Sequence, residues 1–161
     1  MKELSRSILI TIITAIFVLA IVPSAYAASN PYPKQHTIMG FPLVNCTWYA
    51  WQQVYDNTGI ALPNFGNAIN WYSGAQNYGY ATGTVAKANS VAVWRTTNGY
   101  GHVGWVVSVS GSKMKVNEGG MTNSDGTAAA NGTGIVTGAS YNSTVGEPKF
   151  NGSSTILIGF I

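Results

Sequence analysis

Cys46 is the only cysteine in this chain of 161 residues, and its surroundings make it a candidate nucleophile. Asn45 before it is a good helix N-cap, and residues 50–55 have helical apolar spacing. A thiol in the first turn of a helix lies near free N–H groups and partial positive charge, which favour the thiolate. A lone cysteine can also form an intermolecular link or be a buried apolar side chain. A reactive thiol needs a base elsewhere in the chain.

His102 and Glu118 are the candidate base and orienting acid. His102 begins a predicted apolar strand, where an imidazole needs a partner or contact with solvent, and a buried structural histidine is the alternative. Glu118 ends the next predicted strand. A three-residue hairpin loop, residues 109–111, would place the two side chains directly opposite each other on one face of the sheet. A two-residue loop would put them on opposite faces unless a bulge compensates.

Given that geometry, the three side chains predict cysteine-dependent acyl transfer. Cys46 would attack a carbonyl carbon, His102 would carry the thiol proton to the leaving amine, and Glu118 would hold the imidazole in the useful tautomer. Backbone N–H groups at the start of the helix would help to bind the oxyanion. His36 lies in a proline-flanked segment, and we predict that it is a solvated loop residue.

Other chemistries have less support in the sequence. After residue 27 the chain has one cysteine, two histidines and four acids, without the clustered ligands that a zinc site needs. The acids show no recognisable glycosidase pairing, and no glycine loop leads into a helix with a lysine that could hold phosphate. The scattered basic residues argue against a nucleic-acid partner. We therefore expect no metal and no nucleic-acid binding.

The first 27 residues have the pattern of a secretory signal peptide. A basic start precedes an apolar run over residues 8–22, and residues 25–27 fit a small-x-small cleavage site. The run of 15 residues is shorter than the ~20 that span a bilayer, although a retained anchor is the alternative. Cleavage predicts no stable membrane anchor and a secreted protein, which would be periplasmic if the source is Gram-negative.

The remaining residues, 28–161, are predicted to form one domain with two kinds of element. They carry six basic and four acidic side chains, a net charge of +2 that fits contact with anionic cell-surface polymers. Residues 28–40 form an extended, proline-containing lead-in. The predicted elements are helices over 46–56 and 66–79, strands over 90–94, 102–109, 113–118 and 156–161, and a long loop or weak strand over 119–138. Helices followed by antiparallel strands predict an α+β fold.

Aromatic side chains could line a substrate groove beside these residues. Trp48 and Trp71 lie on the two predicted helices, and Tyr100 lies in the polar turn before His102. Their rings could stack on a sugar face or line a peptide groove, although such residues are more often part of the core. We take Trp48, Trp71 and Tyr100 as candidate substrate-binding residues.

Six segments match one family in its own order and at sensible spacing. Residues 46–51 read CTWYAW, residues 100–104 read YGHVG, and Glu118 follows in VNE. The other three segments are residues 66–80, 90–94 and 158–161. Over about residues 41–161 the chain resembles the CHAP domain, the cysteine, histidine-dependent amidohydrolase/peptidase family, in its secreted bacterial form.

The resemblance implies a papain-like fold of the NlpC/P60 type, with N-terminal helices packed on an antiparallel β-sheet. It implies a cysteine hydrolase that cleaves amide bonds of cell-wall peptidoglycan, either as an N-acetylmuramoyl-L-alanine amidase or as an endopeptidase. It carries Cys46, His102 and Glu118 over as catalytic residues and implies no metal or cofactor. Peptidoglycan is the expected partner, so the secreted protein is expected to be associated with the cell wall, and a monomer is expected.

Two departures from the family pattern keep other functions open. Asn45 stands where family members often have glutamine, and Gly120 stands where many have an asparagine two residues after the acid. Asn117 or Asn123 could substitute for that asparagine. A catalytically weak CHAP-like module that binds the wall or a partner is the first alternative. An aromatic-rich carbohydrate-binding protein with a structural cysteine is the second.

Overall fold

The computed structural model describes residues 28–38, 40–122, 129, 133–147 and 155–161. The signal peptide expected over residues 1–27 lies outside these residues. Within the described part of the chain, no helix is both long enough and apolar enough to cross a membrane.

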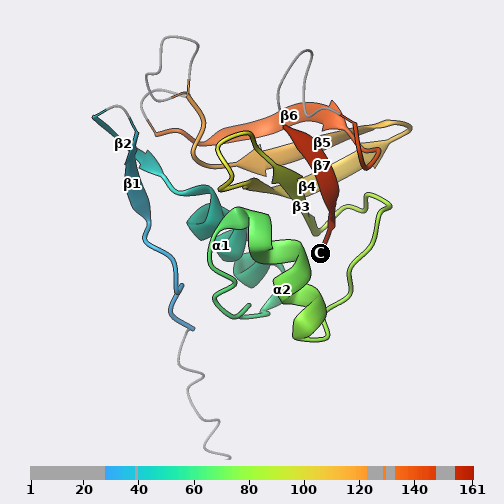
Figure 1. The fold of residues 1–161 in the computed structure, drawn as a ribbon, viewed down its shortest axis with the longest axis horizontal. Helices are drawn as coiled ribbons and strands as arrows, with labels where there is room; N and C mark the ends of the chain where they lie inside the picture. Colours follow the sequence, from blue (N-terminus) through green and yellow to red (C-terminus); the bar gives the residue numbers. More distant parts are fainter. Residues whose placement is uncertain (1–27, 39, 123–128, 130–132, 148–154) are drawn as a thin grey trace, which may run out of the picture.

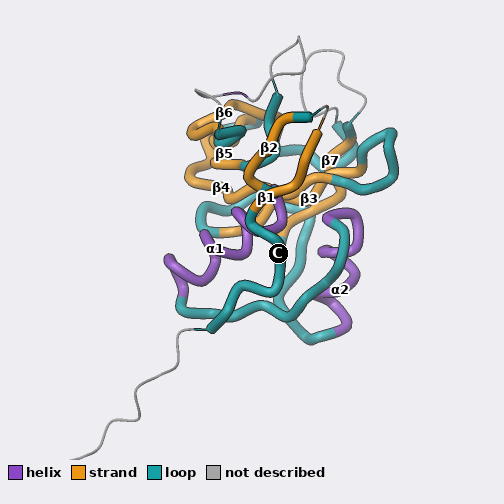
Figure 2. The backbone as a smooth tube through the Cα atoms, turned by 90° about the vertical axis from the view of Figure 1, so that its left-hand side faces the viewer, coloured by secondary structure: helices purple, strands orange, loops and turns teal. Residues whose placement is uncertain are grey.

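Two helices pack on one face of a five-stranded antiparallel sheet, and a separate two-stranded hairpin leads into the first helix (Figure 1, and from the side in Figure 2). The helical elements are α1 (Cys46–Thr58), the short 3₁₀ turn η1 (Ala68–Asn70) and α2 (Trp71–Asn77). The strands of the sheet, in the order β6-β5-β4-β3-β7, are β3 (Ser90–Arg95), β4 (His102–Ser110), β5 (Lys113–Glu118), β6 (Val136–Asn142) and β7 (Ile156–Phe160). The hairpin consists of β1 (Gln35–Ile38) and β2 (Phe41–Val44). This arrangement confirms the predicted α+β class.

Helix α1 has the local signals that start and end a helix. The Asn45 side chain accepts a hydrogen bond from the Thr47 backbone N–H at 3.1 Å, which satisfies one of the free N–H groups of the first turn. Gly59 ends the helix in the left-handed conformation with φ 73°, which glycine adopts without steric cost. The helix begins at Cys46, as predicted, and runs two residues beyond its predicted end. The thiol therefore lies in its first turn.

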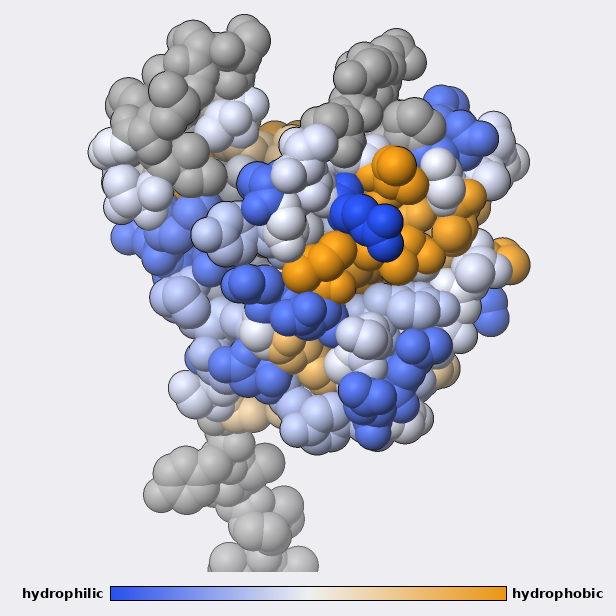
Figure 3. Space-filling view, viewed as in Figure 1, coloured by the Kyte–Doolittle hydropathy of each residue, from blue (hydrophilic) through white to orange (hydrophobic). Residues whose placement is uncertain are grey.

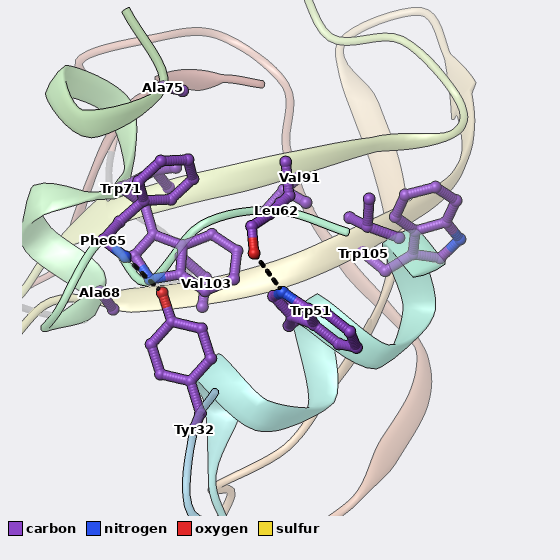
Figure 4. Packing of buried hydrophobic residues seen from close by; sticks show 13 residues of the cluster. Tyr32, Trp51, Leu62, Phe65, Ala68, Trp71, Ala75, Val91, Val103 and Trp105 are labelled. Atoms are coloured by element: carbon purple, nitrogen blue, oxygen red, sulfur yellow. Dashed lines mark hydrogen bonds between the residues drawn. The ribbon is translucent and has the colours of Figure 1, made fainter. Parts of the chain in front are cut away.

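The cluster between the helices and the sheet is built from aromatic and aliphatic side chains (Figure 4). Trp51 of α1 and Trp71 of α2 are fully buried in it. The Trp51 indole N–H donates to the Leu62 carbonyl, and the Tyr32 hydroxyl accepts from the Phe65 N–H, each at 2.7 Å. The sheet contributes Val91, Val93, Val103 and Trp105. This packing fixes the position of α1, and hence of its first residue, on the sheet.

A second apolar cluster covers the opposite face of the sheet. Its buried members are Ala92, Trp94, Val106, Met114, Val116, Tyr141, Leu157 and Phe160. Successive side chains of a strand alternate between the two faces. His102 lies an even number of residues from Val106, and Glu118 an even number from Val116, so both share this second face.

The surface seen in Figure 3 is largely polar, with apolar side chains gathered in one band on the β7 side of the sheet. Ile156, the first residue of β7, is 45% exposed. Exposed apolar side chains are usual on protein surfaces, so this residue by itself indicates no binding site.

The β4–β5 hairpin differs from the prediction in its loop. The loop has two residues, 111–112, and a bulge interrupts the pairing between Val106 and Ser108. Gly111 takes the first loop position with φ 54°, where two-residue hairpin loops favour glycine. The predicted three-residue loop is therefore wrong, and the compensating bulge keeps the candidate base and acid on one face. They are not directly opposite each other.

Two segments form more regular structure than predicted. Residues 35–38 of the lead-in form β1, which pairs with β2. The Asn45 N–H donates to the Lys34 carbonyl at 2.9 Å, so the lead-in is held against the start of α1. Strand β6 begins in the segment predicted as a loop or weak strand and continues beyond it. Its polar, glycine-containing sequence lacks apolar alternation, because it forms the edge of the sheet.

Candidate active site

Cys46 lies at a cleft of about 820 Å³ at the N-terminal end of α1. The lining comes from the lead-in, including His36, from the turn over residues 96–101, and from His102 at the start of β4. A second hollow, of about 410 Å³, lies near the β4–β5 turn and has no histidine, cysteine or acid among its described lining residues. The groups that could carry chemistry therefore gather at the first cleft.

His102 and Glu118 are paired next to this cleft. The His102 Nε2 lies 2.6 Å from the Glu118 Oε2, and the carboxylate is fully buried. The Cys46 thiol interacts with the same imidazole, whose hydrogen bonding and charge lower the pKa of the thiol. Because Nε2 contacts the acid, Nδ1 is the ring nitrogen that is left for the thiol. The structure thus brings the acid, the imidazole and the thiol together as three interacting side chains.

Gly104 makes room for this pairing. The strand register places Glu118 beside Gly104, at a position diagonal to His102. A Cβ on Gly104 would lie 2.5 Å from the Val116 Cγ1 and 3.3 Å from the Glu118 Cβ. Diagonal neighbours are farther apart than opposite ones. Because Gly104 has no side chain, the Glu118 side chain can extend past it to the His102 ring.

Tyr141 on β6 holds the other oxygen of the acid. Its hydroxyl donates to the Glu118 Oε1, while Oε2 faces His102. The Trp94 ring lies 5.7 Å from the His102 ring and 5.5 Å from the Tyr141 ring. Burial and the Glu118 charge raise the pKa of Tyr141 well above its usual value, so its hydroxyl remains a donor. Tyr141 is not among the predicted site residues because it lies on the edge strand β6, whose sequence carries no strand signal.

The environment of Cys46 favours its thiolate. Burial raises the pKa of the thiol, but the hydrogen bond and the charge of His102 lower it, as do backbone hydrogen bonds with Val103 and Thr47. The net effect holds the pKa of Cys46 below the ordinary value of a cysteine. A lowered thiol pKa beside a base is a property of nucleophilic cysteines.

A family model described as the CHAP domain matches residues 36–120, just over half of the chain. The chain belongs to the CHAP domain family. The match contains Cys46, His102 and Glu118, and it confirms the resemblance that the sequence segments indicated.

Curated relatives of this CHAP domain include the staphylococcal secretory antigen ssaA2 from Staphylococcus aureus. In strain NCTC 8325 / PS 47 it is 39% identical over 75 residues, which cover 45% of this chain and 26% of the antigen. In strain MRSA252 it is 37% identical over 75 residues. The chain thus spans about a quarter of the length of these relatives. Among solved structures, an N-acetylmuramoyl-L-alanine amidase from Staphylococcus aureus is 20% identical, with 71% of this chain and 30% of that chain covered and a TM-score of 0.46.

One of the three aromatic candidates lines the cleft of this CHAP domain. Tyr100 is 63% exposed and is part of the lining. Trp48 is half-buried on α1, with the Lys34 Nζ 5.1 Å from its ring, and it lies outside the described lining. Trp71 is 0% exposed in the apolar core. The prediction that Trp71 contacts substrate is therefore wrong, because no substrate can reach its ring.

The position two residues after the acid borders the nucleophile. Gly120 has φ 76°, and a Cβ there would lie 3.5 Å from the Cys46 backbone nitrogen. Asn117 does not substitute for the family's asparagine, because its side-chain oxygen accepts from the Gly138 N–H at 2.8 Å. Asn123 lies outside the described residues. In this CHAP domain, Tyr141 makes the second contact with the acid.

His36 is not the solvated loop residue that its proline-flanked position predicted. It lies on β1, is half-buried and lines the cleft. Its Nδ1 is buried without a hydrogen-bond partner among the described residues, and burial lowers the pKa of the ring. The prediction is wrong because the pairing of β1 with β2 brings the lead-in to the start of α1. A four-residue strand is too short to leave a clear periodic signal.

Proposed function

We propose that this chain is a cysteine hydrolase that cleaves amide bonds in bacterial cell-wall peptidoglycan. The observation that carries the proposal is the pairing of Glu118 with His102 next to Cys46, whose thiol pKa His102 lowers, at the edge of a cleft. Membership of the CHAP family, whose name denotes cysteine, histidine-dependent amidohydrolases and peptidases, supports the same reaction class.

In the proposed reaction, Cys46 is the nucleophile and His102 is the base. The imidazole takes the thiol proton, and the thiolate adds to the carbonyl carbon of the scissile amide, whose oxygen becomes an oxyanion. When the C–N bond breaks, the imidazolium gives its proton to the leaving amine, and a thioester remains. Water, deprotonated by the same imidazole, then hydrolyses the thioester and releases the carboxylic acid and the free thiol.

The neighbouring groups stabilise the charges that this reaction develops. Glu118 stabilises the imidazolium and holds its Nε2–H, so that Nδ1 faces the thiol. The first turn of α1 supplies backbone N–H groups for the oxyanion. Gly120 has no side chain to fill the space near the Cys46 nitrogen, which leaves that N–H open to an incoming carbonyl oxygen.

The proposal extends to the fold and to the site of action. A helix that begins with the cysteine and packs on an antiparallel sheet that carries the histidine supports a papain-like arrangement of the NlpC/P60 type. We also propose that residues 1–27 direct export and are removed. This would leave a monomer of residues 28–161 at the cell wall, with a lead-in over residues 28–40 and a catalytic domain over residues 41–161. The apolar run over residues 8–22 supports export.

Clearing of a purified peptidoglycan suspension tests the proposal. We expect the wild-type protein to lower the turbidity and Cys46→Ala to leave it unchanged, with far-UV circular dichroism to show that both are folded. Equal clearing by the two proteins would refute the role of Cys46 as the nucleophile. Binding by both proteins without cleavage by either would favour the alternative, a wall-binding module.

Mass spectrometry of the digested peptidoglycan identifies the bond. An N-acetylmuramoyl-L-alanine amidase separates the whole stem peptide from the amino sugar, so it creates a free alanine amino terminus and an unsubstituted muramic acid. An endopeptidase leaves the sugar–peptide link intact and creates new ends inside the stem or the cross-bridge. The two outcomes differ in fragment mass, so a single digest distinguishes them.

A further inference from the structure

His36 is a polar side chain at the cleft that the proposed mechanism does not use. It lies on β1, is half-buried and lines the same cleft as Cys46. Its Nδ1 is buried and has no hydrogen-bond partner among the described residues. Buried polar atoms in native proteins are nearly always paired, so a half-buried imidazole with an unpaired buried nitrogen at a cleft is not explained by the contacts of the fold alone.

The His36 ring is held close to the candidate nucleophile. A Cβ on Gly120 would lie 3.7 Å from the His36 Cε1 and 3.5 Å from the Cys46 backbone nitrogen, so the ring and the first turn of α1 border one small space. In the β1–β2 pairing, His36 is opposite Leu43, which is fully buried, and β2 leads directly into α1. Backbone pairing therefore sets the position of the ring relative to the thiol.

The surroundings of the ring indicate which nitrogen carries its proton. Burial lowers the pKa of His36, so the neutral imidazole, with one N–H and one lone pair, is the relevant form. A buried N–H without an acceptor is rarer in proteins than a buried acceptor without a donor. The lone pair is therefore assigned to Nδ1 and the N–H to Nε2. The ring can then offer a donor to a molecule in the cleft.

We propose that His36 is a substrate-binding residue whose Nε2–H donates a hydrogen bond to a peptide carbonyl oxygen of bound peptidoglycan, beside the amide that Cys46 attacks. The inference rests on the proposed function, from which it takes the substrate class. A neutral donor suits an uncharged carbonyl, whereas a carboxylate would favour an imidazolium that burial disfavours. In this role His36 contributes to the binding of the peptide in the cleft.

Two variants distinguish loss of the His36 N–H donor from loss of the flat ring. His36→Phe keeps a flat ring without a donor, and His36→Gln keeps a neutral N–H donor. On a soluble muropeptide, we expect His36→Phe to raise KM about tenfold with kcat within about twofold, because a contact made equally in the ground state and the transition state is lost. His36→Gln should raise KM by less than about threefold. An unchanged KM in His36→Phe, or equal losses in the two variants, would overturn the inference.

Alkylation of Cys46 by iodoacetamide distinguishes substrate binding from a structural role. The thiol pKa is shifted by burial, by His102 and by the backbone of Val103 and Thr47, and His36 is not among these causes. We therefore expect His36→Phe to be alkylated at the wild-type rate. A changed rate would place His36 in the environment of the nucleophile and overturn its assignment to substrate.

The tautomer can be measured without any hydrolysis. Imidazole ¹⁵N shifts of the labelled wild-type protein at neutral pH should show the proton of His36 on Nε2. A proton on Nδ1, or a doubly protonated ring, would overturn the inference even if the protein cleaves peptidoglycan. A wild-type protein that does not cleave peptidoglycan would instead refute the proposed function, and the ¹⁵N measurement is independent of that result.

Discussion

The two faces of the large sheet contrast in what they bury. On the helix face, Trp51 and Trp71 pack among aromatic and aliphatic side chains. On the opposite face, next to the cleft, His102, Glu118 and Tyr141 form a polar chain at the border of a second apolar cluster. Burial of a large apolar side chain stabilises the fold by roughly 1.5–3 kcal/mol, whereas a buried carboxylate costs several kcal/mol unless it is paired.

The contrast indicates a division between stability and reactivity. The helix face positions α1 by apolar packing and by the buried hydrogen bond of Trp51, and changes there should lower the free energy of unfolding. The polar chain acts on the thiol through hydrogen bonds and charge, since His102 lowers the pKa of Cys46 and Glu118 holds His102. Changes there should alter the reactivity of Cys46 more than the stability of the fold. Four variants or measurements can test this division.

Glu118→Gln should have the largest effect, and on catalysis. Glutamine keeps the shape of the acid but removes the charge that stabilises the imidazolium, so we expect the rate of peptidoglycan cleavage to fall by about 10³-fold or more. Cleavage rates at low substrate concentration measure the loss. Glu147→Gln is the matched control, because that acid is exposed. A loss below about tenfold in Glu118→Gln would contradict the orienting role of the acid.

Trp71→Ala should affect stability instead. Its indole is fully buried, so truncation should lower the free energy of unfolding by about 3–5 kcal/mol, as measured by urea denaturation. Trp48→Ala, on the half-buried tryptophan of α1, should cost less than half as much. Under conditions where Trp71→Ala is still folded, its thiol should be alkylated at the wild-type rate. A large change in that rate would show that the two faces are not separable.

Gly104→Ala should lower both the stability of the fold and the reactivity of Cys46, because the register of the β4–β5 pairing places Gly104 beside Glu118. The new Cβ would lie 2.5 Å from the Val116 Cγ1, and overpacking of this kind costs about 1–3 kcal/mol of stability. Displacement of the neighbouring Glu118 should also slow thiol alkylation at neutral pH. Gly83→Ala is the control, since a Cβ there meets open space. Unchanged stability and an unchanged alkylation rate in Gly104→Ala would contradict the conclusion that the His102–Glu118 pairing needs a residue without a side chain at position 104.

The helix face could be predicted from the sequence because its signals are local. Asn45 and Gly59 mark the ends of α1, and the apolar spacing around Trp71 marks the second helix. The same spacing argues that Trp71 is buried, which the structure shows, and against a contact with substrate. Periodicity and capping place both ends of α1 to within two residues, whereas the helix predicted over residues 66–79 is observed as η1 followed by the shorter α2.

The polar face could be predicted only in part because its contacts join distant segments. Alternation along β4 and β5 predicted a shared face for His102 and Glu118, but the loop length and the bulge were ambiguous in the sequence. Tyr141 and His36 were missed because each depends on a strand whose pairing is set by the tertiary fold. Neither strand has apolar alternation long enough to reveal it.

The pH dependence of thiol alkylation is the smallest expected effect and the sharpest test of the division between the faces. The thiolate reacts and the thiol does not, so the rate rises with pH through the thiol pKa, and the wild-type midpoint should lie below that of free cysteine because the pKa of Cys46 is lowered. In Glu118→Gln the imidazolium loses its counter-charge, so the thiolate–imidazolium pair is less favoured and the midpoint should rise by about one unit. Glu147→Gln and Trp71→Ala should keep the wild-type midpoint. If the midpoint of Glu118→Gln does not move, the acid does not act on the thiol through His102. If the midpoint of Trp71→Ala moves equally, the apolar core and the polar chain are one coupled unit.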